Sequence, residues 1–578
     1  MDKAPHVNLQ STSHYFLEGL NELGIEYLFC NFGTDHAPLI EEMARWDKAG
    51  LRYPKTILCP HENTAMHMAA GYAAVTGRGQ AVVVHVDCGT ANSAMGTHNL
   101  RRAKIPVMLL AGRAPYTVRG ELAGSRDSYV HFIQEPFDQA SIVRPYCKWL
   151  WTLPSGVISK EALRRAHTVA HSDPQGPVYL MLPRETLAET WDAGAIRSFP
   201  EERYGPVGAG AADPAQVASL AERLNNARYP ILLTSYSGRN TRTPALIDEL
   251  ARFAGIRVFE ANPSRLNISR ESPCFVGFLP GKHVAAADVG LMVDVDVPWI
   301  PKETPENPNT YWAHIDVDVV KQDFPIWGFP NNLRLQGDSF LVLAQLLEAL
   351  KARSTPAFRD AAARRLETIR REHEERLPGV SKMAADKGSA GNINPHYVCA
   401  ELARAIAAED VVINEGIRNS PAVMNQIPRT RPGSYFGLAG GALGYSSGMA
   451  LGVKLARPDS TVVHVVGDGS FYFGNPSSVY AVAKQFRLPI FTVLMDNSGW
   501  SAVKESTLRM YPGGEAVAAG EFHSLLAPQM EFAKVAEAAG AYGETVADPE
   551  AVPAAIQRCM KEVRGGRAAL MHVRVPAL

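Results

Sequence analysis

The chain has 578 residues, 46% hydrophobic and 20% charged, a composition that is ordinary for a soluble globular protein. Its 58 lysines and arginines nearly balance 59 aspartates and glutamates, so no global charge would draw it to nucleic acid or to an anionic membrane. The seven cysteines lack CxxC spacing, and the sequence has neither a signal-like N-terminus nor a transmembrane run, so we expect a cytoplasmic protein with reduced thiols and no nucleic-acid or membrane partner.

Residues 1–190 alternate predicted helices and strands. Helices are expected at 12–23, 37–48 and 63–75, and strands at 26–30, 57–59, 80–86 and 107–111. This alternation predicts a doubly wound, mostly parallel α/β domain.

The rest of the chain repeats this organisation twice. A polar, proline-containing linker at 192–214 leads into a second α/β block, 191–355, with strands at 229–235 and 289–293. A connector, 356–389, contains a charge-laced helix at 361–377 and precedes the third block, 390–578. We expect the second block to act as a scaffold and the connector helix to be solvated.

The third block contains a strand at 461–466, the tripeptide GDG, a helix at 477–486, a strand at 489–494 and then Asn497. The carboxyl ends of neighbouring parallel strands lie at one edge of a sheet, where open α/β sheets bind their ligands. Asp468 and Asn497 are therefore expected to converge there.

A carboxylate and an amide oxygen, together with the carbonyl of Gly499, suit Mg²⁺, which prefers hard oxygen ligands. Because Mg²⁺ usually completes its octahedron with water and phosphate oxygens, the missing ligands are expected from a diphosphate. Each motif alone is more typical of an ordinary turn, and their shared place at adjacent strand ends is what favours a metal site.

GDG followed by a helix, a strand and Asn497 resembles the thiamine diphosphate signature of the 2-oxo acid decarboxylase and acetolactate synthase superfamily. The resemblance covers essentially the whole chain and implies three doubly wound α/β domains: pyrimidine-binding, central and diphosphate-binding. It implies thiamine diphosphate and Mg²⁺ as cofactors. It also implies a homodimer at least, and commonly a homotetramer, because relatives build the site from the glutamate of one subunit and the diphosphate site of another.

The segment PHENTAMHMAAGYAAVTG, 60–77, resembles the strand, glutamate and alanine-rich helix of this family. The resemblance makes Glu62 the catalytic glutamate, which shares a proton with the aminopyrimidine and so promotes loss of the thiazolium C2 proton. The alternative is a first-turn helix residue favoured by the macrodipole.

The resemblance also implies contacts with the diphosphate. In NEGIRNS, 414–420, Arg418 or Asn419 would bind phosphate, although Asn419 also suits a helix cap. In GGALGYSSGMALG, 440–452, Leu443 would support the bent cofactor, with plain core as the alternative. The expected cofactor contacts are Glu62, Arg418, Asn419, Gly441, Leu443, Gly469, Ser470 and Asn497, and the expected metal ligands are Asp468, Asn497 and Gly499.

Other segments are most similar to benzoylformate decarboxylase and its close relatives. LFCNFGTDHAPLI, 28–40, would place Thr34 near the substrate. HVDCGTANSAMG, 85–96, would make His85 a catalytic histidine that relays a proton when neutral, with a buried structural histidine as the alternative.

The departures from these relatives are informative as well. VDVDVPWIPKE, 293–303, lacks the second histidine of benzoylformate decarboxylase and the basic segment of flavin-containing acetolactate synthases, so FAD is not expected. Val503 falls where pyruvate decarboxylases carry a protonating glutamate, although Glu505 is close enough to blur the alignment.

The implied reaction is decarboxylation of a 2-oxo acid to a cofactor-bound enamine, which is released as an aldehyde or transferred to a second carbonyl. The expected partners are a small 2-oxo acid and an aldehyde acceptor. The alternatives are an acetolactate synthase-type transferase without flavin and a non-catalytic module that only binds the cofactor.

Overall fold

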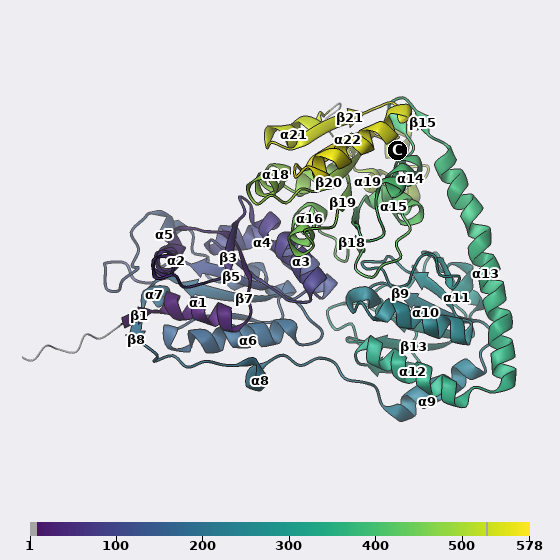
Figure 1. Cartoon of the computed structure of the whole chain (residues 1–578), viewed down its shortest axis with the longest axis horizontal. Coiled ribbons are helices and arrows are strands. Elements are labelled where there is room, and N and C mark those ends of the chain that lie inside the picture. Colours follow the sequence, from purple (N-terminus) through teal and green to yellow (C-terminus); the bar gives the residue numbers. More distant parts are fainter. Residues whose placement is uncertain (1–8, 527–529, 578) are drawn as a thin grey trace, which may run out of the picture.

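The computed structural model describes residues 9–526 and 530–577. The strands of this part form three six-stranded sheets and two short two-stranded pairs. Each six-stranded sheet is the centre of one α/β domain, as expected, and Figure 1 shows the first domain on the left, the central domain at the lower right and the third domain above. No helix in the described ranges combines the length and apolarity needed to cross a membrane.

The first and third sheets have the same strand order. In the first it is β3-β2-β4-β5-β7-β6 and in the third β18-β17-β19-β20-β22-β21, so both read 2-1-3-4-6-5 when strands are counted from the first of each sheet. The strands of the first sheet are β2 (Tyr27–Asn31), β3 (Lys55–Leu58), β4 (Ala81–Val84), β5 (Met108–Arg113), β6 (Leu150–Thr152) and β7 (Val178–Pro183). Those of the third are β17 (Val411–Glu415), β18 (Tyr435–Gly437), β19 (Val462–Gly467), β20 (Phe491–Asp496), β21 (Tyr542–Val546) and β22 (Ala569–Arg574).

Helices cover both faces of these two sheets, which explains why their central strands are continuous apolar runs such as the fully buried β4. The first sheet is covered by α1 (Thr12–Glu22), α2 (Ala37–Ala49) and α6 (Ser159–His171) on one face and by α3 (Glu62–Thr76) and α4 (Val86–Ala103) on the other. The third is covered by α14 (Pro395–Ala405), α15 (Ser420–Gln426) and α22 (Val552–Arg564) on one face and by α16 (Tyr445–Ala456), α18 (Pro476–Gln485) and α21 (Phe532–Ala538) on the other.

Helices α3 and α16 pack against each other and join the cores of the first and third domains. Their backbones touch at glycines: a Cβ atom at Gly71 would lie 2.2 Å from the carbonyl oxygen of Met449, and one at Gly452 would lie 1.9 Å from that of Met68. The small residues of α3 therefore serve contact between two domains.

The central sheet has the order β11-β10-β9-β12-β13-β14. Its strands are β9 (Pro230–Thr234), β10 (Arg257–Glu260), β11 (Phe275–Gly277), β12 (Val289–Val293), β13 (Tyr311–Asp316) and β14 (Leu333–Gln336), and its helices are α9 (Pro214–Asn225), α10 (Thr243–Ala254), α11 (Lys282–Ala286) and α12 (Ser339–Arg353).

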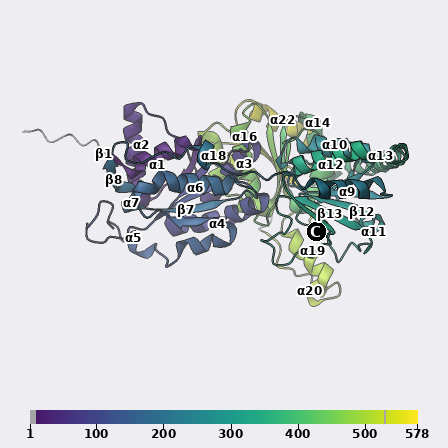
Figure 2. The same cartoon turned by 90° about the horizontal axis from the view of Figure 1, so that it is seen from below.

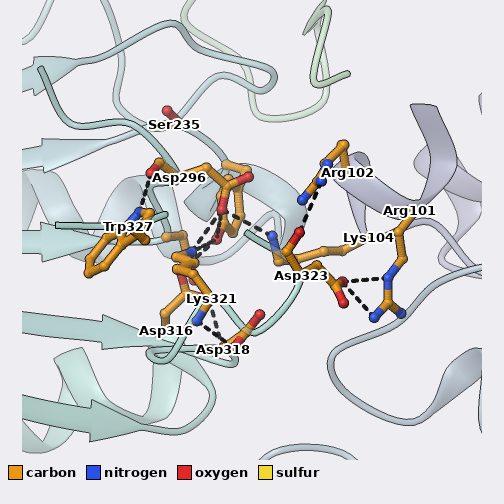
Figure 3. Close-up of polar contacts among 12 residues, drawn as sticks. Arg101, Arg102, Lys104, Ser235, Asp296, Asp316, Asp318, Lys321, Asp323 and Trp327 are labelled. Carbon is orange, nitrogen blue, oxygen red and sulfur yellow. Dashed lines mark hydrogen bonds and ion pairs between the residues drawn. The ribbon is translucent and has the colours of Figure 1, made fainter. Parts of the chain in front are cut away.

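Ion pairs dock the end of α4 onto the central domain (Figure 3). Arg101 Nε donates to Asp323 Oδ2 at 2.6 Å, and Lys104 Nζ lies 3.4 Å from Asp296 Oδ1. Buried Lys321 contacts Asp296 at 2.8 Å and Asp316 at 2.6 Å, so each of these buried charges has a partner.

Two segments connect the domains. The predicted linker begins where β8 (Thr190–Asp192) pairs with β1 (Leu9–Ser11), and it runs past the short helix α8 (Glu201–Tyr204) to the central domain (Figure 1). The connector helix α13 (Pro356–Ala385) is longer than predicted and is not solvated on all sides, because Phe358 belongs to the core of the central domain and Ile369 is buried.

Candidate active site

Asp468 and Asn497 meet at the carboxyl edge of the third sheet. Asp468 begins the short helix α17 (Asp468–Phe473) directly after β19, and its Oδ2 accepts a hydrogen bond from the Gly499 amide at 2.9 Å. Asn497 comes directly after β20 and donates through Nδ2 to the hydroxyl of Ser501. The two strand ends thus come together as their sequence positions indicated.

A cavity of about 260 Å³ opens beside these residues. The predicted residues that line it are Arg418, Gly441, Leu443, Asp468, Gly469, Ser470, Asn497 and Gly499. Asn419 is not among the lining residues, whereas Val503 is. Every described residue that lines the cavity belongs to the third domain, so Glu62 of the same chain does not contribute to its wall.

Asp468 is a buried carboxyl group in the cavity wall, and a second carboxyl group, Asp496, lies near it. Burial raises the pKa of Asp468 to about 7, and the neighbouring Asp496 adds to this effect. Burial also opposes ionisation of Asp496, but the hydrogen bond from His572 Nε2, 2.9 Å away, lowers the pKa of Asp496 below its ordinary value. A buried carboxylate with a second carboxylate nearby is better stabilised by a cation than by further burial.

The oxygen donors at this edge fit Mg²⁺ bound to a diphosphate. Within the described part of the chain, no group of three or more His, Cys, Asp or Glu side chains could hold a metal by itself. One carboxylate, one amide oxygen and one backbone carbonyl leave the remaining octahedral positions for phosphate and water, which is the usual arrangement for Mg²⁺.

A buried glutamate that sequence reasoning missed supports the glycine-rich turn. Glu415, at the end of β17, accepts from the Gly444 amide at 2.5 Å and from the Ser446 amide at 2.9 Å, and so caps α16. Burial raises the pKa of Glu415 to about 7. Gly444 has a φ of +86°, which favours glycine, and this turn presents Leu443 to the cavity.

Helix α19 (Ser501–Met510) forms another wall of the cavity, and Figure 2 shows it projecting from the third domain together with α20 (Glu515–Ala519). Val503 of α19 lines the cavity and is half exposed. Glu505 is paired with Arg418, with 3.2 Å between Oε1 and Nε, so the two residues near the predicted protonation site differ in environment.

Glu62 lies at the carboxyl edge of the first sheet, where it begins α3 and is buried. Its Oε1 accepts from Asn31 Nδ2 at 2.9 Å, and its Oε2 accepts from Asn92 Nδ2 at 3.0 Å. The two amides hold the carboxylate in one orientation. Sequence reasoning missed both asparagines, because they lie 31 and 30 residues from Glu62 and only the fold brings them together.

His85 lies near Thr34 at the same edge. His85 Nδ1 is 2.5 Å from Asp35 Oδ1, and the hydrogen bond with Asp35 raises the pKa of His85 above its ordinary value. This contact favours the protonated ring, in contrast to the neutral ring expected from the sequence. Thr34 Oγ1 is 3.0 Å from Nε2 of His131, a further residue that sequence reasoning missed.

Glycine allows the His85 ring to sit beside the strand-to-helix turn after β2. A Cβ atom at Gly33 would lie 2.0 Å from His85 Nδ1, and one at Gly112 would lie 1.1 Å from Asp35 Oδ2. The Asp35–His85 pair therefore occupies a space that larger residues at these two positions would fill.

Comparison with known proteins identifies the class of site. The N-terminal TPP binding domain of thiamine pyrophosphate enzymes matches residues 10–142, and the C-terminal TPP binding domain matches residues 418–573. Benzoylformate decarboxylase from Pseudomonas aeruginosa is 25% identical over 94% of this chain and 95% of its own length. The acetolactate synthase large subunit from Haemophilus influenzae is 24% identical over 95% of this chain and 91% of its own.

A solved structure has the same fold across the whole chain. The thiamine diphosphate-dependent 4-hydroxybenzoylformate decarboxylase of Rhodococcus jostii RHA1 has a TM-score of 0.74 at 22% identity, covering 98% of this chain and 100% of that one. The first and third domains thus match the two TPP binding domains, and the chain belongs to the thiamine pyrophosphate enzyme family.

Proposed function

We propose that the protein is a Mg²⁺-dependent thiamine diphosphate enzyme that decarboxylates a 2-oxo acid and then releases an aldehyde or joins the remaining carbon fragment to a second carbonyl. The observation that carries the proposal is the cavity beside Asp468, Asn497 and Gly499, which offers hard oxygen donors at the carboxyl edge of two parallel strands. The matches to both TPP binding domains support it.

In this proposal the third domain holds the cofactor. Asp468, Asn497 and the Gly499 carbonyl bind Mg²⁺, Arg418 and Ser470 bind the diphosphate, and Leu443 forms the apolar wall. When bound, thiamine diphosphate supplies the nucleophilic carbon and accepts the electron pair left when carbon dioxide departs.

In this proposal the first domain supplies the side chains that transfer protons. Asn31 and Asn92 hold the Glu62 carboxylate in one orientation, which suits it to share a proton with a ring nitrogen. In this proposal His85 holds or delivers a proton at its ring, and the Thr34 hydroxyl, which contacts His131, orients the substrate.

We propose that a second copy of the chain completes the site, giving a homodimer at minimum and a homotetramer as the next assembly. Two observations support this. Glu62 does not line the cavity of its own chain, and the segment that contacts Thr34 and His85 exposes the apolar side chains of Tyr129, Ile133 and Phe137. Glu62 of one copy would then face the cavity of the other.

The relatives suggest which donor to test first. Two of them are named for benzoylformate or 4-hydroxybenzoylformate, which favours aryl 2-oxo acids, while the acetolactate synthase relative favours a small aliphatic acid and transfer to a second carbonyl without flavin. The decisive experiment is to measure carbon dioxide release from a panel of 2-oxo acids, with and without added aldehyde.

The panel separates the alternatives. Release without aldehyde formation, but with a new hydroxy ketone, indicates ligation, and release with free aldehyde indicates simple decarboxylation. Cofactor binding with no exchange at thiazolium C2 and no release from any acid would contradict the proposal and indicate a non-catalytic binding module.

A further inference from the structure

The contacts of His85 indicate which of its ring nitrogens carry a proton. Asp35 lies in the 3₁₀ helix η1 (Thr34–His36) and is fully buried, with Oδ1 2.5 Å from His85 Nδ1 and 3.3 Å from His36 Nδ1. Burial opposes ionisation of Asp35, but the two histidines hold the pKa of its carboxyl well below its usual range. Asp35 is therefore an acceptor, and His85 Nδ1 carries a proton.

The other ring nitrogen also faces an acceptor. His85 Nε2 is 2.9 Å from Gln134 Oε1, just beyond the short helix α5 (Val130–Ile133). The amide of Gln134 is oriented by its own Nε2, which donates to Cys88 Sγ at 3.5 Å and so turns the carbonyl oxygen toward the ring. A neutral imidazole has one N–H and would leave one of these two acceptors facing a lone pair.

The surrounding charges agree with a protonated ring. Asp87 on α4 favours the charged form of His85. The neighbours of like charge are His131, when protonated, and Arg184, whose charge acts on both His131 and Asp35. Burial lowers the pKa of His131, so this neighbour tends to stay neutral. The side chain of His85 is 22% exposed, which gives solvent access to restore a proton after it is donated.

We propose that Gln134 is a positioning residue that holds a proton on Nε2 of His85, so that His85 rests as an imidazolium with Nδ1–H bound to Asp35. This inference rests on the proposed 2-oxo acid chemistry. The substrate displaces the Gln134 carbonyl, the Nε2–H bond breaks, a C–H bond forms at the carbon that lost carbon dioxide, and water returns the proton to the neutral ring. Gln134 therefore sets whether His85 acts as an acid or as a base.

The test measures the protonation of His85 directly. Histidine C2 hydrogen–deuterium exchange, followed by mass spectrometry across pH, gives a midpoint for each histidine in the full-length protein. The wild-type midpoint of His85 should lie above about 6.5, the ordinary value. Gln134→Leu should lower it by about one pH unit or more, because the charged donor loses its acceptor, and Gln134→Glu should raise it.

A matched control distinguishes loss of the Gln134–His85 contact from a general change in the loop that contains Gln134. Glu135 lies next to Gln134 but pairs with Arg126, so Glu135→Gln should leave the His85 midpoint unchanged. The pH dependence of the rate of carbon dioxide release should shift in the same direction as the His85 midpoint in the Gln134 variants. It should stay unchanged in the Glu135→Gln control.

An unchanged His85 midpoint in both Gln134 variants, or a wild-type midpoint below the ordinary value, would overturn this inference. Neither result would affect the proposed function, which depends on carbon dioxide release and cofactor binding. Conversely, absence of carbon dioxide release with a midpoint that responds to Gln134 would overturn the proposed function and leave the protonation of His85 intact.

Discussion

The first and third domains share one strand order but surround its carboxyl edge with different side chains. At the carboxyl edge of the first sheet the residues proposed to transfer protons are held by neighbours, with Glu62 between two amides and His85 between Asp35 and Gln134. At the same edge of the third sheet they surround an open cavity with Asp468 in its wall. One topology therefore provides either a precise side-chain orientation or a space with ligands, depending on the residues in the turn after each strand.

The difference begins in those turns. After β19 the chain continues with Asp468 and Gly469, which line the cavity, whereas after β4 His85 stands at the start of α4 without a side-chain capping bond. If this contrast is correct, substitutions at the edge of the first sheet should stop proton transfer without loss of cofactor. Substitutions at the edge of the third sheet should release the cofactor.

Glu62→Gln should have the largest effect. It should slow deuterium exchange at thiazolium C2 by two to four orders of magnitude, roughly the contribution of a positioned acid or base, because an amide cannot share the proton in the same way. Cofactor affinity, measured by calorimetry, should stay close to wild type. Glu161 is an exposed acid in the first turn of α6, and Glu161→Gln should leave exchange unchanged. If the two variants show the same rate of exchange at C2, Glu62 serves only to begin α3.

Asp468→Ala should weaken binding of thiamine diphosphate in Mg²⁺ by roughly 100-fold or more, since the diphosphate loses the carboxylate that holds its counter-charge. Titration calorimetry with and without Mg²⁺ measures the change. The control is Asp459→Ala, which removes an exposed acid from the same domain. An affinity that matches wild type would remove the basis for the metal site.

Gly71→Ala tests the contact that joins the two domains. The new methyl group would meet the Met449 carbonyl at 2.2 Å, so we expect a loss of about 1–3 kcal/mol in the free energy of unfolding. Gly379 is also helical but faces open space, and Gly379→Ala should stabilise by about 0.5–1 kcal/mol. Denaturant unfolding measures both, and equal shifts would show that α3 and α16 are not in backbone contact.

Val503→Glu tests whether the third domain avoids proton transfer. An apolar side chain at the cavity wall neither donates a proton nor holds a reactive water, so ligation to an added aldehyde should compete with protonation by His85 and give a substantial share of the product. The variant should shift the product ratio several-fold toward free aldehyde, and Val503→Leu should not. Chromatography of both products at matched acceptor concentration gives the ratio. If wild type yields almost only aldehyde and Val503→Glu changes nothing, His85 alone accounts for protonation.

The smallest effect concerns pH-dependent stability. The folded pKa of His85 is raised, so its stabilisation is present below its unfolded value of about 6.5 and is lost as pH rises through the folded value. The folded pKa of Asp35 is lowered, so its stabilisation is present above about 3.9 and is lost as pH falls.

His85→Asn should therefore lower the melting temperature more at about pH 5 than at about pH 9. His523 is highly exposed, and His523→Asn should show no such difference. A larger penalty at alkaline pH would mean that His85 is stabilised as the neutral ring.

Much of the fold could be predicted because its signals are local. The predicted helix at 63–75 corresponds to α3, and the predicted strand at 289–293 matches β12. Errors fall where an element changes type: residues 80–86 were expected as one strand, but β4 ends at Val84 and α4 begins at Val86. Val86 is as apolar as the strand before it, so periodicity does not mark the change.

The candidate site was predictable only where a motif is contiguous or at a strand end. Asp468, Asn497 and Leu443 came from such motifs, and the cavity includes all three. Gln134 and Glu415 could not be predicted, because their partners are distant in the sequence. Gln134 reaches His85 from a loop, and Glu415 caps α16, which begins 30 residues later. Neither type of residue has a pattern that distinguishes it from an ordinary polar side chain.

The glycine contact between α3 and α16 also bears on how the protein is made. Asn63 at the start of α3 donates to the carbonyl of Gly444, a partner 381 residues further along the chain. At translation rates of about 5–20 residues per second, roughly 20–80 seconds separate the synthesis of the start of α3 from that of the start of α16. During that interval the face of α3 that packs against α16 has no partner, so the nascent first domain exposes surface that is buried in the finished protein.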